Sequence, residues 1–364
     1  MSTGARNKAG EFFGMYGNWY NGHMTHQSLY RAYRPHGFSD LVGQDQIVKP
    51  LTEQLATKKI GHAYLFAGSR GLGKTSVARI FARELGTDDR DLYEIDAASN
   101  NSVDDIRALT EQVYTLPFNS TYKVYILDEA HMLSKGAWNA FLKTLEEPPA
   151  HALFILATTE LEKVPETVRS RCQVFEFKKP TREVLSTMVA TIAKKEGYTL
   201  EPAGADLVAM LADGSYRDAL SVLEKVLASA TDKKLSLVEV EQATGAPKHA
   251  LVHALVEALS NGKTDSALEA IHAAQTQDVD MNLYLSLVLE HIRSVLLVRH
   301  APELCKEIQA ELGADVYGEV VALAQLEGSK LSHKTLKVFL DAASRIRFSP
   351  VPVLPLELAV LELA

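Results

Sequence analysis

The stretch Gly68-Ser69-Arg70-Gly71-Leu72-Gly73-Lys74-Thr75 decides the fold class of this 364-residue chain. It matches the pattern G-x-x-x-x-G-K-[ST], follows the apolar run Ala63–Ala67 directly and opens a helical stretch that continues to Arg83. Glycines in such a loop let backbone N–H groups turn towards phosphate oxygens, and the N-terminus of the following helix adds partial positive charge. The sequence therefore predicts a phosphate-binding loop between a strand and a helix.

Two side chains of this loop have a specific chemistry. Lys74 can reach the β- and γ-phosphates of a nucleotide, and the Thr75 hydroxyl can ligate Mg²⁺. A chance match is the alternative, since short patterns recur in unrelated proteins, but the strand–loop–helix context argues against it. The residues predicted to bind nucleotide in this loop are Gly68, Ser69, Arg70, Gly71, Leu72, Gly73, Lys74, Thr75 and Ser76.

A second motif, Val124-Tyr125-Ile126-Leu127-Asp128-Glu129, is an apolar run that ends in two acids. We predict that Asp128 lies near a bound Mg²⁺ and that Glu129 orients and deprotonates the attacking water. An acid pair at a strand end can instead cap a helix, but a preceding phosphate-binding loop favours the catalytic interpretation. Glu129 in particular indicates hydrolysis rather than passive nucleotide binding.

A third apolar run, Leu153–Ala157, ends in Thr158-Thr159-Glu160. A hydroxyl at the tip of a strand beside the Asp128 strand can hydrogen-bond the γ-phosphate or the attacking water. Taken alone, these threonines are better explained as local caps of a turn.

Short apolar runs alternate with helical patterns between Leu29 and Lys179, which is typical of a parallel α/β sheet. The expected strands are Ala63–Ala67, Leu92–Ile95, Lys123–Leu127, Leu153–Ala157 and Gln173–Phe177. After Pro180 we expect no further strand. The helices expected next are Glu183–Gly197, Gly204–Asp213 and Arg217–Ala230, and Leu251, Leu255, Val256 and Leu259 form one apolar face of another that ends at Asn261-Gly262.

The chain is therefore divided into four parts. We expect a flexible leader or tag-like extension over residues 1–27 and a P-loop ATPase domain over residues 28–179. A small helical domain is expected over residues 180–243, and a helical packing or oligomerisation domain over residues 244–364.

Composition restricts the partners and the compartment. The formal net charge is −8, so any DNA contact must come from a local patch or from a partner. Cys172 and Cys305 are the only cysteines, which excludes a disulfide scaffold and an all-cysteine zinc site and suits a reducing cytosol. Both are expected to be buried as small apolar residues. No uninterrupted run of about 18 apolar residues occurs, so we expect no membrane span and a cytoplasmic protein.

The motifs also follow one another in the order of a known family. Besides the two nucleotide motifs they are Tyr33-Arg34-Pro35, Phe38–Gln44, Glu94–Asn101, Ala130–Ser134, Lys143–Pro149 and Ser170-Arg171-Cys172. From about Leu29 to its end, the chain resembles the gamma/tau subunits of bacterial DNA polymerase III, the AAA+ ATPases of clamp loaders, and Leu354–Leu358 resembles their collar. The resemblance implies a five-stranded parallel sheet in the order 5-1-4-3-2, followed by a helical lid and an all-helical collar.

The resemblance also implies roles for single residues. Arg171 would be the arginine finger that reaches the γ-phosphate of a neighbouring subunit. Thr159 matches the sensor-1 position, with Thr158 as the alternative, and Arg217 matches the sensor-2 arginine of the lid. Without the family, both arginines would be assigned to surface salt bridges. The residues implied on the adenine side are Arg34, Pro35, Leu41 and Val42.

DNA contact is implied for one side chain. Ser102-Val103-Asp104-Asp105 has the pattern of a capping box that starts a helix. In clamp loaders the corresponding helix faces the central chamber, where amides and basic side chains follow phosphates. Arg107 matches a DNA-contacting arginine of the family, and the alternative is an ion pair with Asp104.

The implied activity is an ATPase motor that uses ATP and Mg²⁺ to load a sliding clamp onto primer–template DNA. The implied partners are further clamp-loader subunits in a pentameric ring, of delta, delta-prime and gamma types, together with the clamp and the DNA, and no membrane. Two alternatives stay open. One is a non-catalytic clamp-loader subunit, and the other is a different AAA+ DNA motor such as a branch-migration helicase, which needs a winged helix near its C-terminus.

In two respects the chain departs from the family. The family usually has a four-cysteine zinc module before the Glu94 strand, whereas Arg83–Asp91 bridges the gap here without any cysteine or histidine. From the sequence, zinc is therefore not expected as a cofactor of this chain. The chain also ends where the collar is expected to end, as in the gamma form or a shortened tau form.

Overall fold

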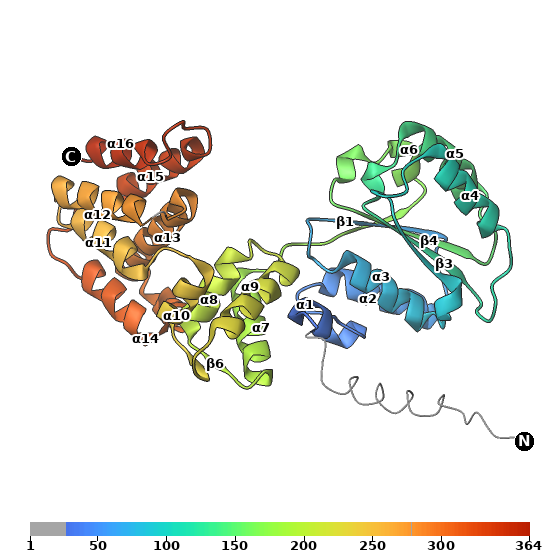
Figure 1. Cartoon of the computed structure of the whole chain (residues 1–364), viewed down its shortest axis with the longest axis horizontal. Helices are drawn as coiled ribbons and strands as arrows, with labels where there is room; N and C mark the ends of the chain where they lie inside the picture. The colour runs from blue at the N-terminus through green and yellow to red at the C-terminus, as the bar shows by residue number, and fades with distance from the viewer. Residues whose placement is uncertain (1–26, 278) are drawn as a thin grey trace, which may run out of the picture.

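The computed structural model describes residues 27–277 and 279–364. Apart from its last residue, the leader predicted over residues 1–27 lies outside the described residues. Three units follow one another along the chain: a sheet domain at one end, a middle helical unit and a C-terminal helical unit (Figure 1).

The sheet domain is built on five parallel strands. They are β1 (Ala63–Ala67), β2 (Leu92–Asp96), β3 (Lys123–Asp128), β4 (Ala152–Thr158) and β5 (Gln173–Glu176). Their order across the sheet is β2-β3-β4-β1-β5, which is the predicted order 5-1-4-3-2 counted from the other edge. The prediction of the sheet is confirmed, with strand ends that differ by one residue at most.

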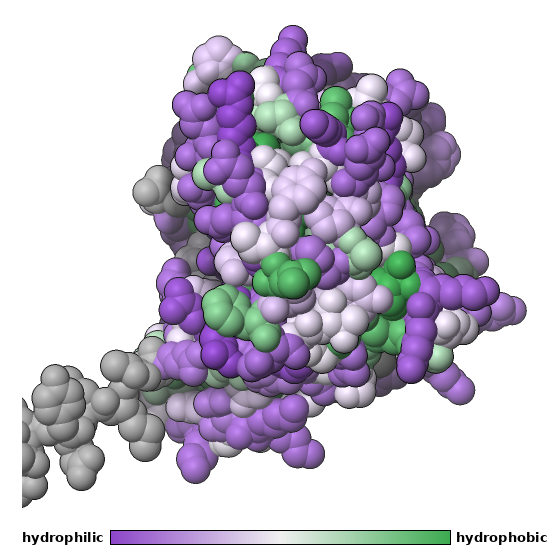
Figure 2. All heavy atoms as spheres, turned by 90° about the vertical axis from the view of Figure 1, so that its right-hand side faces the viewer, coloured by the Kyte–Doolittle hydropathy of each residue, from purple (hydrophilic) through white to green (hydrophobic). Residues whose placement is uncertain are grey.

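Helices cover both faces of this sheet, which explains why its central strands are continuous apolar runs. One face is covered by α2 (Asp45–Thr57) and α3 (Lys74–Glu84), and the other by α4 (Val103–Val113), α5 (Lys135–Glu146) and the short α6 (Glu166–Arg169). Every residue of β1 and β4 is buried, whereas residues of the edge strands β2 and β5 are half-buried or exposed. The side of this domain seen in Figure 2 is mainly polar, with small, separate apolar patches.

The middle helical unit packs around its own core. Its elements are α7 (Arg182–Lys195), β6 (Thr199–Leu200), α8 (Pro202–Leu211), α9 (Tyr216–Ser229), β7 (Lys234–Leu235) and α10 (Leu237–Thr244). The first of the described helices, α1 (Leu29–Ala32), also lies here, because Leu29 is buried in this core and its N–H donates to Glu224 of α9.

The expectation that no strand follows Pro180 is wrong, because β6 and β7 form a parallel pair with Leu200 opposite Leu235. Each strand has two residues, which is too short to produce a period-2 pattern in the sequence. A fourth helix, α10, was also not predicted. It begins at a capping box in which Ser236 and Glu239 bond each other's backbone N–H groups.

The C-terminal helical unit consists of helices over its described residues. They are α11 (His249–Ser260), α12 (Thr264–Thr276), α13 (Met281–His300), α14 (Cys305–Ala324), α15 (His333–Ile346) and α16 (Leu354–Glu362). The predicted apolar face of α11 is confirmed, since Leu255 and Val256 are fully buried, and the helix ends before Gly262, which has a φ of 66°. Short 3₁₀ turns occur at Phe38–Asp40, Asp89–Asp91, Ala130–Met132, Leu161–Lys163 and Pro302–Leu304.

Helix α13 is the one described helix whose length and composition would suffice to cross a membrane. Its sequence is interrupted by the charged residues Glu290 and Arg293. Tyr284, Val288 and Ile292 on its apolar face are fully buried in the core of the C-terminal unit. The apolar character of α13 is therefore explained by packing inside this unit.

Candidate functional site

The phosphate-binding loop leaves the end of β1 and enters α3. Gly73, the residue before α3, has a φ of 92°, a left-handed conformation that favours glycine. Lys74 is buried, and its Nζ donates to the carbonyl oxygens of Gly68 (2.6 Å) and Ser69 (2.9 Å). The loop thus holds its lysine folded back over its own backbone, at the N-terminus of a helix.

Thr75 and Asp128 meet beside the loop, as the sequence predicted for a metal pair. The Thr75 Oγ1 donates to Asp128 Oδ2 at 2.8 Å, and Asp128 Oδ1 accepts from the N–H of Glu129 at 3.0 Å. A hydroxyl and a carboxylate are hard oxygen ligands, which fits Mg²⁺. Burial lowers the pKa of Lys74, while Glu129 and Asp128 act in the opposite direction.

Glu129 is held in a strained position next to this pair. Its φ of 48° is unusual for a residue with a side chain, and it comes directly after β3. The Thr159 Oγ1 donates to Glu129 Oε2 at 3.1 Å. Thr158 is instead fully buried, with its Oγ1 3.1 Å from His131 Nδ1 and accepting from the N–H of Glu160. Of the two threonines, Thr159 is the one directed at the predicted catalytic acid.

His131 was not assigned a role from the sequence, yet it lies at the centre of this polar group. Its Nδ1 is 3.5 Å from Glu129 Oε2, and its Nε2 is 3.3 Å from Glu160 Oε1. The ring is almost fully buried. The only sequence signal was its place two residues after Glu129, on the short turn that follows β3.

The residues predicted on the adenine side lie at the start of the sheet domain. Arg34 is half-buried, and its Nε donates to the Ser76 hydroxyl at 3.0 Å. Burial, aided by Arg79, lowers the pKa of Arg34. Pro35 and Leu41 are half-buried and Val42 is exposed.

The middle helical unit contacts the phosphate-binding loop directly. Tyr216 donates its N–H to the Gly71 carbonyl at 3.1 Å and its hydroxyl to the Val42 carbonyl. A Cβ added at Gly71, whose φ is 77°, would clash with the Ser215 hydroxyl. Arg217, the predicted sensor arginine, is in the first turn of α9, with its guanidinium 4.7 Å from the centre of the Tyr30 ring. The sequence singled out Arg217 but missed Ser215, Tyr216 and Tyr30.

Arg171 lies away from the phosphate-binding loop of its own chain. Its guanidinium donates to Glu146 Oε1 and to the Thr167 carbonyl, both at 2.6 Å. Across residues 27–277 and 279–364 it has no hydrogen bond or ion pair with Gly68–Ser76. Its side chain is 34% exposed, which leaves it accessible to another chain.

Arg107 lies on α4, whose predicted capping box between Ser102 and Asp105 is confirmed. Its side chain is 67% exposed and pairs with Asp104 at 3.4 Å. Such an exposed pair is weak. The ion pair with Asp104 is the alternative given for Arg107 in the sequence analysis, and it leaves the Arg107 guanidinium open to solvent.

The bridge Arg83–Asp91 is anchored by its last residue. Asp91 is buried and accepts N–H bonds from Phe118 (2.7 Å), Asn119 (3.1 Å) and Ser120 (3.0 Å). The two cysteines were expected to be buried, but both are half-buried. Burial of the Cys172 thiol still raises its pKa to about 12, because removal from water disfavours the charged thiolate.

Two family models match the chain. A model described as DNA polymerase III, delta subunit, matches residues 43–96 and 87–181, and one described as DNA polymerase III clamp loader subunit, ATPase lid domain, matches residues 185–232. The second match coincides with the greater part of the middle helical unit.

Curated relatives match over most of the chain. DNA polymerase III subunit tau of Bacillus subtilis is 41% identical over 305 residues, 77% of this chain and 54% of the relative. The gamma/tau subunit of Mycoplasma pneumoniae is 35% identical over 342 residues, 88% of this chain and 46% of the relative. Subunit tau of Escherichia coli is 37% identical over 300 residues, 77% of this chain and 46% of the relative. The chain spans about half the length of the curated relatives it matches.

Solved structures share the fold. The Thermotoga maritima RuvB Holliday junction branch migration motor aligns with a TM-score of 0.51 at 21% identity, over 80% of this chain and 91% of that one. At that identity the likeness concerns the fold alone. Together with the strand order, it confirms the predicted fold class of a AAA+ sheet domain followed by helical units.

Proposed function

Because this chain belongs to the gamma/tau family of DNA polymerase III subunits, we propose that it is an ATPase motor subunit of a clamp loader. In this role it binds and hydrolyses ATP with Mg²⁺ in the cytoplasm, and the cycle loads a sliding clamp onto primer–template DNA. The observation that supports the proposal best is the convergence of Lys74, Thr75, Asp128, Glu129 and Thr159 at one edge of the sheet.

The topology explains this convergence. The last residues of β1 and β4, Ala67 and Thr158, are paired in register, and β3 runs parallel on the other side of β4. The segments that follow these three strands therefore leave the sheet at the same edge, where ligands of open α/β sheets bind. The sheet thus brings together Lys74 and Thr159, which are more than 80 positions apart in the sequence.

In the proposed reaction, Lys74 acts on the phosphate oxygens of ATP and Glu129 acts on the water that attacks the γ-phosphate. Lys74 exchanges the carbonyls of Gly68 and Ser69 for β- and γ-phosphate oxygens, and Thr75 and Asp128 hold Mg²⁺, which neutralises phosphate charge when it is bound. Glu129 accepts a proton from the attacking water and later releases it to solvent.

Thr159 fixes the carboxylate of Glu129 through its hydroxyl, so that the acid faces the water rather than its own strand. The nucleotide base lies against Arg34, Pro35 and Val42, since these residues precede α2 on the same side as the loop.

The domain division proposed from the sequence, with residues 28–179 as ATPase domain, 180–243 as lid and 244–364 as collar, gives the lid a sensing role. Its residues Ser215 and Tyr216 touch Gly71 of the phosphate-binding loop, and Arg217 is adjacent. A rearrangement of the loop around phosphates is therefore transmitted to the lid by direct contact.

Assembly and DNA binding rest on two exposed arginines. Arg171 acts on the nucleotide of a neighbouring subunit in a pentameric ring with delta, delta-prime and further gamma-type subunits, after its bond to Glu146 opens. That pair is partly exposed, so opening it costs only about 1 kcal/mol. Arg107 contacts DNA phosphates from α4 in the same assembly.

Each alternative activity has an observation against it. A non-catalytic subunit does not need Glu129 or the hydrogen bond from Thr159 that orients it. A branch-migration helicase needs a winged helix, whose wing is a β-hairpin, and the described residues between His249 and Ala364 form no strand.

The test compares Lys74→Ala and Glu129→Gln with the unaltered protein, assembled with its partner subunits. Lys74→Ala should abolish ATP binding, measured by fluorescent-nucleotide titration, and with it clamp loading. Glu129→Gln should keep ATP binding and lower ATPase kcat by about 10²–10⁴-fold. Clamp loading that persists in Lys74→Ala, or full ATPase activity in Glu129→Gln, would contradict the proposal.

A further inference from the structure

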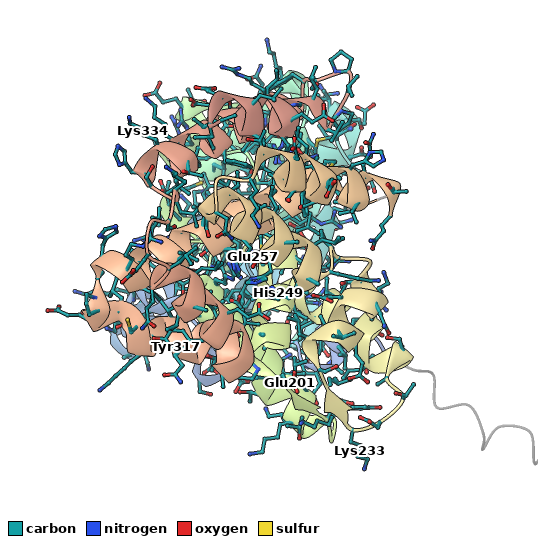
Figure 3. All side chains as sticks on the ribbon, turned by 90° about the vertical axis from the view of Figure 1, so that its left-hand side faces the viewer. Glu201, Lys233, His249, Glu257, Tyr317 and Lys334 are labelled. Atoms are coloured by element: carbon teal, nitrogen blue, oxygen red, sulfur yellow. The ribbon has the colours of Figure 1, made fainter. Side chains whose placement is uncertain are left out.

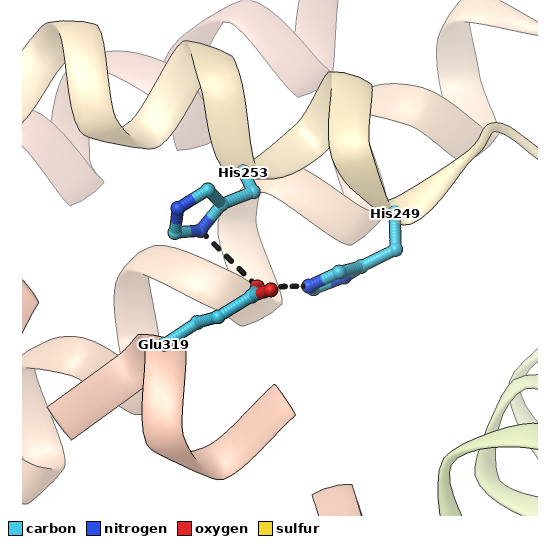
Figure 4. A group of neighbouring side chains, drawn as sticks. All are labelled: His249, His253 and Glu319. Atoms are coloured by element: carbon cyan, nitrogen blue, oxygen red, sulfur yellow. Dashed lines mark hydrogen bonds and ion pairs between the residues drawn. The ribbon is translucent and has the colours of Figure 1, made fainter. Parts of the chain in front are cut away.

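A cluster of histidines lies far from the nucleotide site, on the C-terminal helical unit. His249 and His253 are one turn apart on α11, and Glu319 approaches them from α14 (Figure 4). The Glu319 Oε2 is 2.7 Å from His249 Nε2 and 3.4 Å from His253 Nδ1. Residues four apart on a helix share a face, so both rings are presented to the same carboxylate.

We propose that His249, His253 and Glu319 bind a divalent transition-metal ion of the Zn²⁺ type, which links α11 to α14. One ligand atom from each residue lies within 4.8 Å of the others. Imidazole nitrogen and carboxylate oxygen bind Zn²⁺ at about 2.0–2.2 Å, which puts the ligand atoms of a tetrahedral site about 3.3 Å apart. Small side-chain rotations suffice to bring the three residues to this spacing.

A third imidazole supports a metal site rather than a simple ion pair. His291 of α13 is 6% exposed, and its Nε2 is buried without a hydrogen-bond partner. Its ring centre lies 5.4 Å from that of His249 and 5.6 Å from that of His253. Imidazoles that share one tetrahedral ion have ring centres about 5 Å apart, so the ring of His291 is spaced as a fourth ligand of this ion would be.

The hydrogen bonding inside the cluster is incomplete without an ion. Glu319 forms a hydrogen bond with His249, whereas the buried Nδ1 of His253 has no hydrogen-bond partner although the carboxylate is near. Buried nitrogens are rarely left unpaired.

The position of the cluster suggests what the ion would do. The N–H of His249 donates to Glu241, a buried carboxylate of α10 in the middle helical unit, at 2.6 Å. His249 and His291 both line a pocket of about 70 Å³ together with Asp206 of α8 and Leu312 of α14. Figure 3 shows His249 where the helices of the C-terminal unit meet those of the middle unit. A bound ion would therefore stiffen this junction.

The experiment uses the full chain, freed of metal with a chelator and returned to a non-coordinating buffer at pH 7.5 without nucleotide. Zn²⁺ alone is titrated by calorimetry, and Co²⁺ serves as a coloured substitute whose visible absorption is strong only in tetrahedral sites. We expect one equivalent to bind tightly, with a rise in thermal midpoint that grows with the Zn²⁺ concentration. Absence of this equivalent in the unaltered chain would overturn the proposal.

Variants locate the ion. His253→Gln and Glu319→Gln should each weaken Zn²⁺ binding by about 100-fold or more, since loss of groups that merely support a ligand already costs 10–100-fold. His272→Gln, an exposed histidine of α12, is the matched control and should bind as before. Equal affinity in His253→Gln and His272→Gln would mean surface binding elsewhere and would overturn the site.

His291 is tested separately with His291→Phe, which keeps a ring in the core. We expect this variant to retain Zn²⁺ with an affinity lowered by about 10-fold and to lose most of the Co²⁺ absorption. An unchanged Co²⁺ spectrum would remove His291 from the ligand set. Circular dichroism of each variant verifies folding, and none of these measurements depends on clamp loading or on ATP hydrolysis.

Discussion

Replacing Asp91 by alanine should destabilise the sheet domain, because one carboxylate holds a whole turn. The three N–H groups of Phe118, Asn119 and Ser120 converge on its two oxygens, and the Ser120 hydroxyl binds the Asp88 N–H nearby. This arrangement ties the bridge that precedes β2 to the segment that precedes β3. In the family that the chain resembles, a four-cysteine zinc module is usual at this position before β2.

The expected loss of stability follows from these bonds. A hydrogen bond to a charged acceptor contributes about 1.5–3 kcal/mol net. Phe118 and Asn119 are exposed, so water replaces part of what is lost at these two amides. We therefore expect Asp91→Ala to lower the free energy of unfolding by about 3 kcal/mol, well below the sum of three bonds.

The effect should also depend on pH. Burial raises the pKa of Asp91, but the hydrogen bonds from Phe118, Asn119 and Ser120 outweigh it and bring the pKa from 3.8 to about 2. A carboxyl with a depressed pKa stabilises the fold above its unfolded pKa, and this contribution disappears as the pH falls through the folded value. The difference between wild type and Asp91→Ala should thus be constant above pH 5 and shrink between pH 4 and pH 2.

Urea unfolding followed by tryptophan fluorescence measures this difference. Trp138 is 3% exposed in the same core as Val113 at the end of α4, and a Trp19→Phe background makes it the only tryptophan. The midpoint should fall by about 1–3 M, given slopes of about 1–3 kcal/mol/M. Asp89→Ala, an exposed neighbour, is the control. A midpoint for Asp91→Ala equal to that of the control, or a difference that grows in acid, would refute the reasoning.

Two further predictions concern the nucleotide site. Thr159→Val removes the hydrogen bond to Glu129 and should lower ATPase kcat by about 10–100-fold. Thr158→Val should instead lower the free energy of unfolding by about 1–2 kcal/mol, with a smaller loss of kcat. If steady-state assays show the larger loss of kcat for Thr158→Val, the two threonines have exchanged roles. Gly71→Ala strains a left-handed residue by about 1–2 kcal/mol and pushes against Ser215, so ATP affinity should fall about 10-fold by nucleotide titration. Adding Ser215→Gly should restore part of it, and no recovery would mean that backbone strain alone acts.

Much of the proposed nucleotide site could be described from the sequence, because its chemistry is encoded locally. Lys74 and Thr75 are adjacent in the phosphate-binding loop, and Asp128 and Glu129 end a strand. Such motifs depend on backbone conformation over a few residues, which the glycines and the apolar runs fix. The structure then brings Thr75 and Asp128 together at one edge of the sheet.

Other parts of the site depend on side-chain direction, which no local pattern contains. Successive residues of a strand point to opposite faces, so the choice between Thr158 and Thr159 depended on where β4 ends and what lies opposite. The short pair β6–β7 was missed because two residues show no period. The packing of Ser215 on Gly71 joins the middle helical unit to the sheet domain, between residues far apart in the sequence.

The stretch from Gly68 to Thr75 by itself indicated the fold class and the nucleotide chemistry proposed here, because a strand, a glycine-rich turn and a helix start are all local. Only the tertiary structure decided which hydroxyl faces Glu129, which amides Asp91 binds, and that His249 and His253 of α11 lie beside His291 of α13. These outcomes depend on packing between segments far apart in the chain, where contact is set by the complementary shapes of surfaces and not by neighbouring residues.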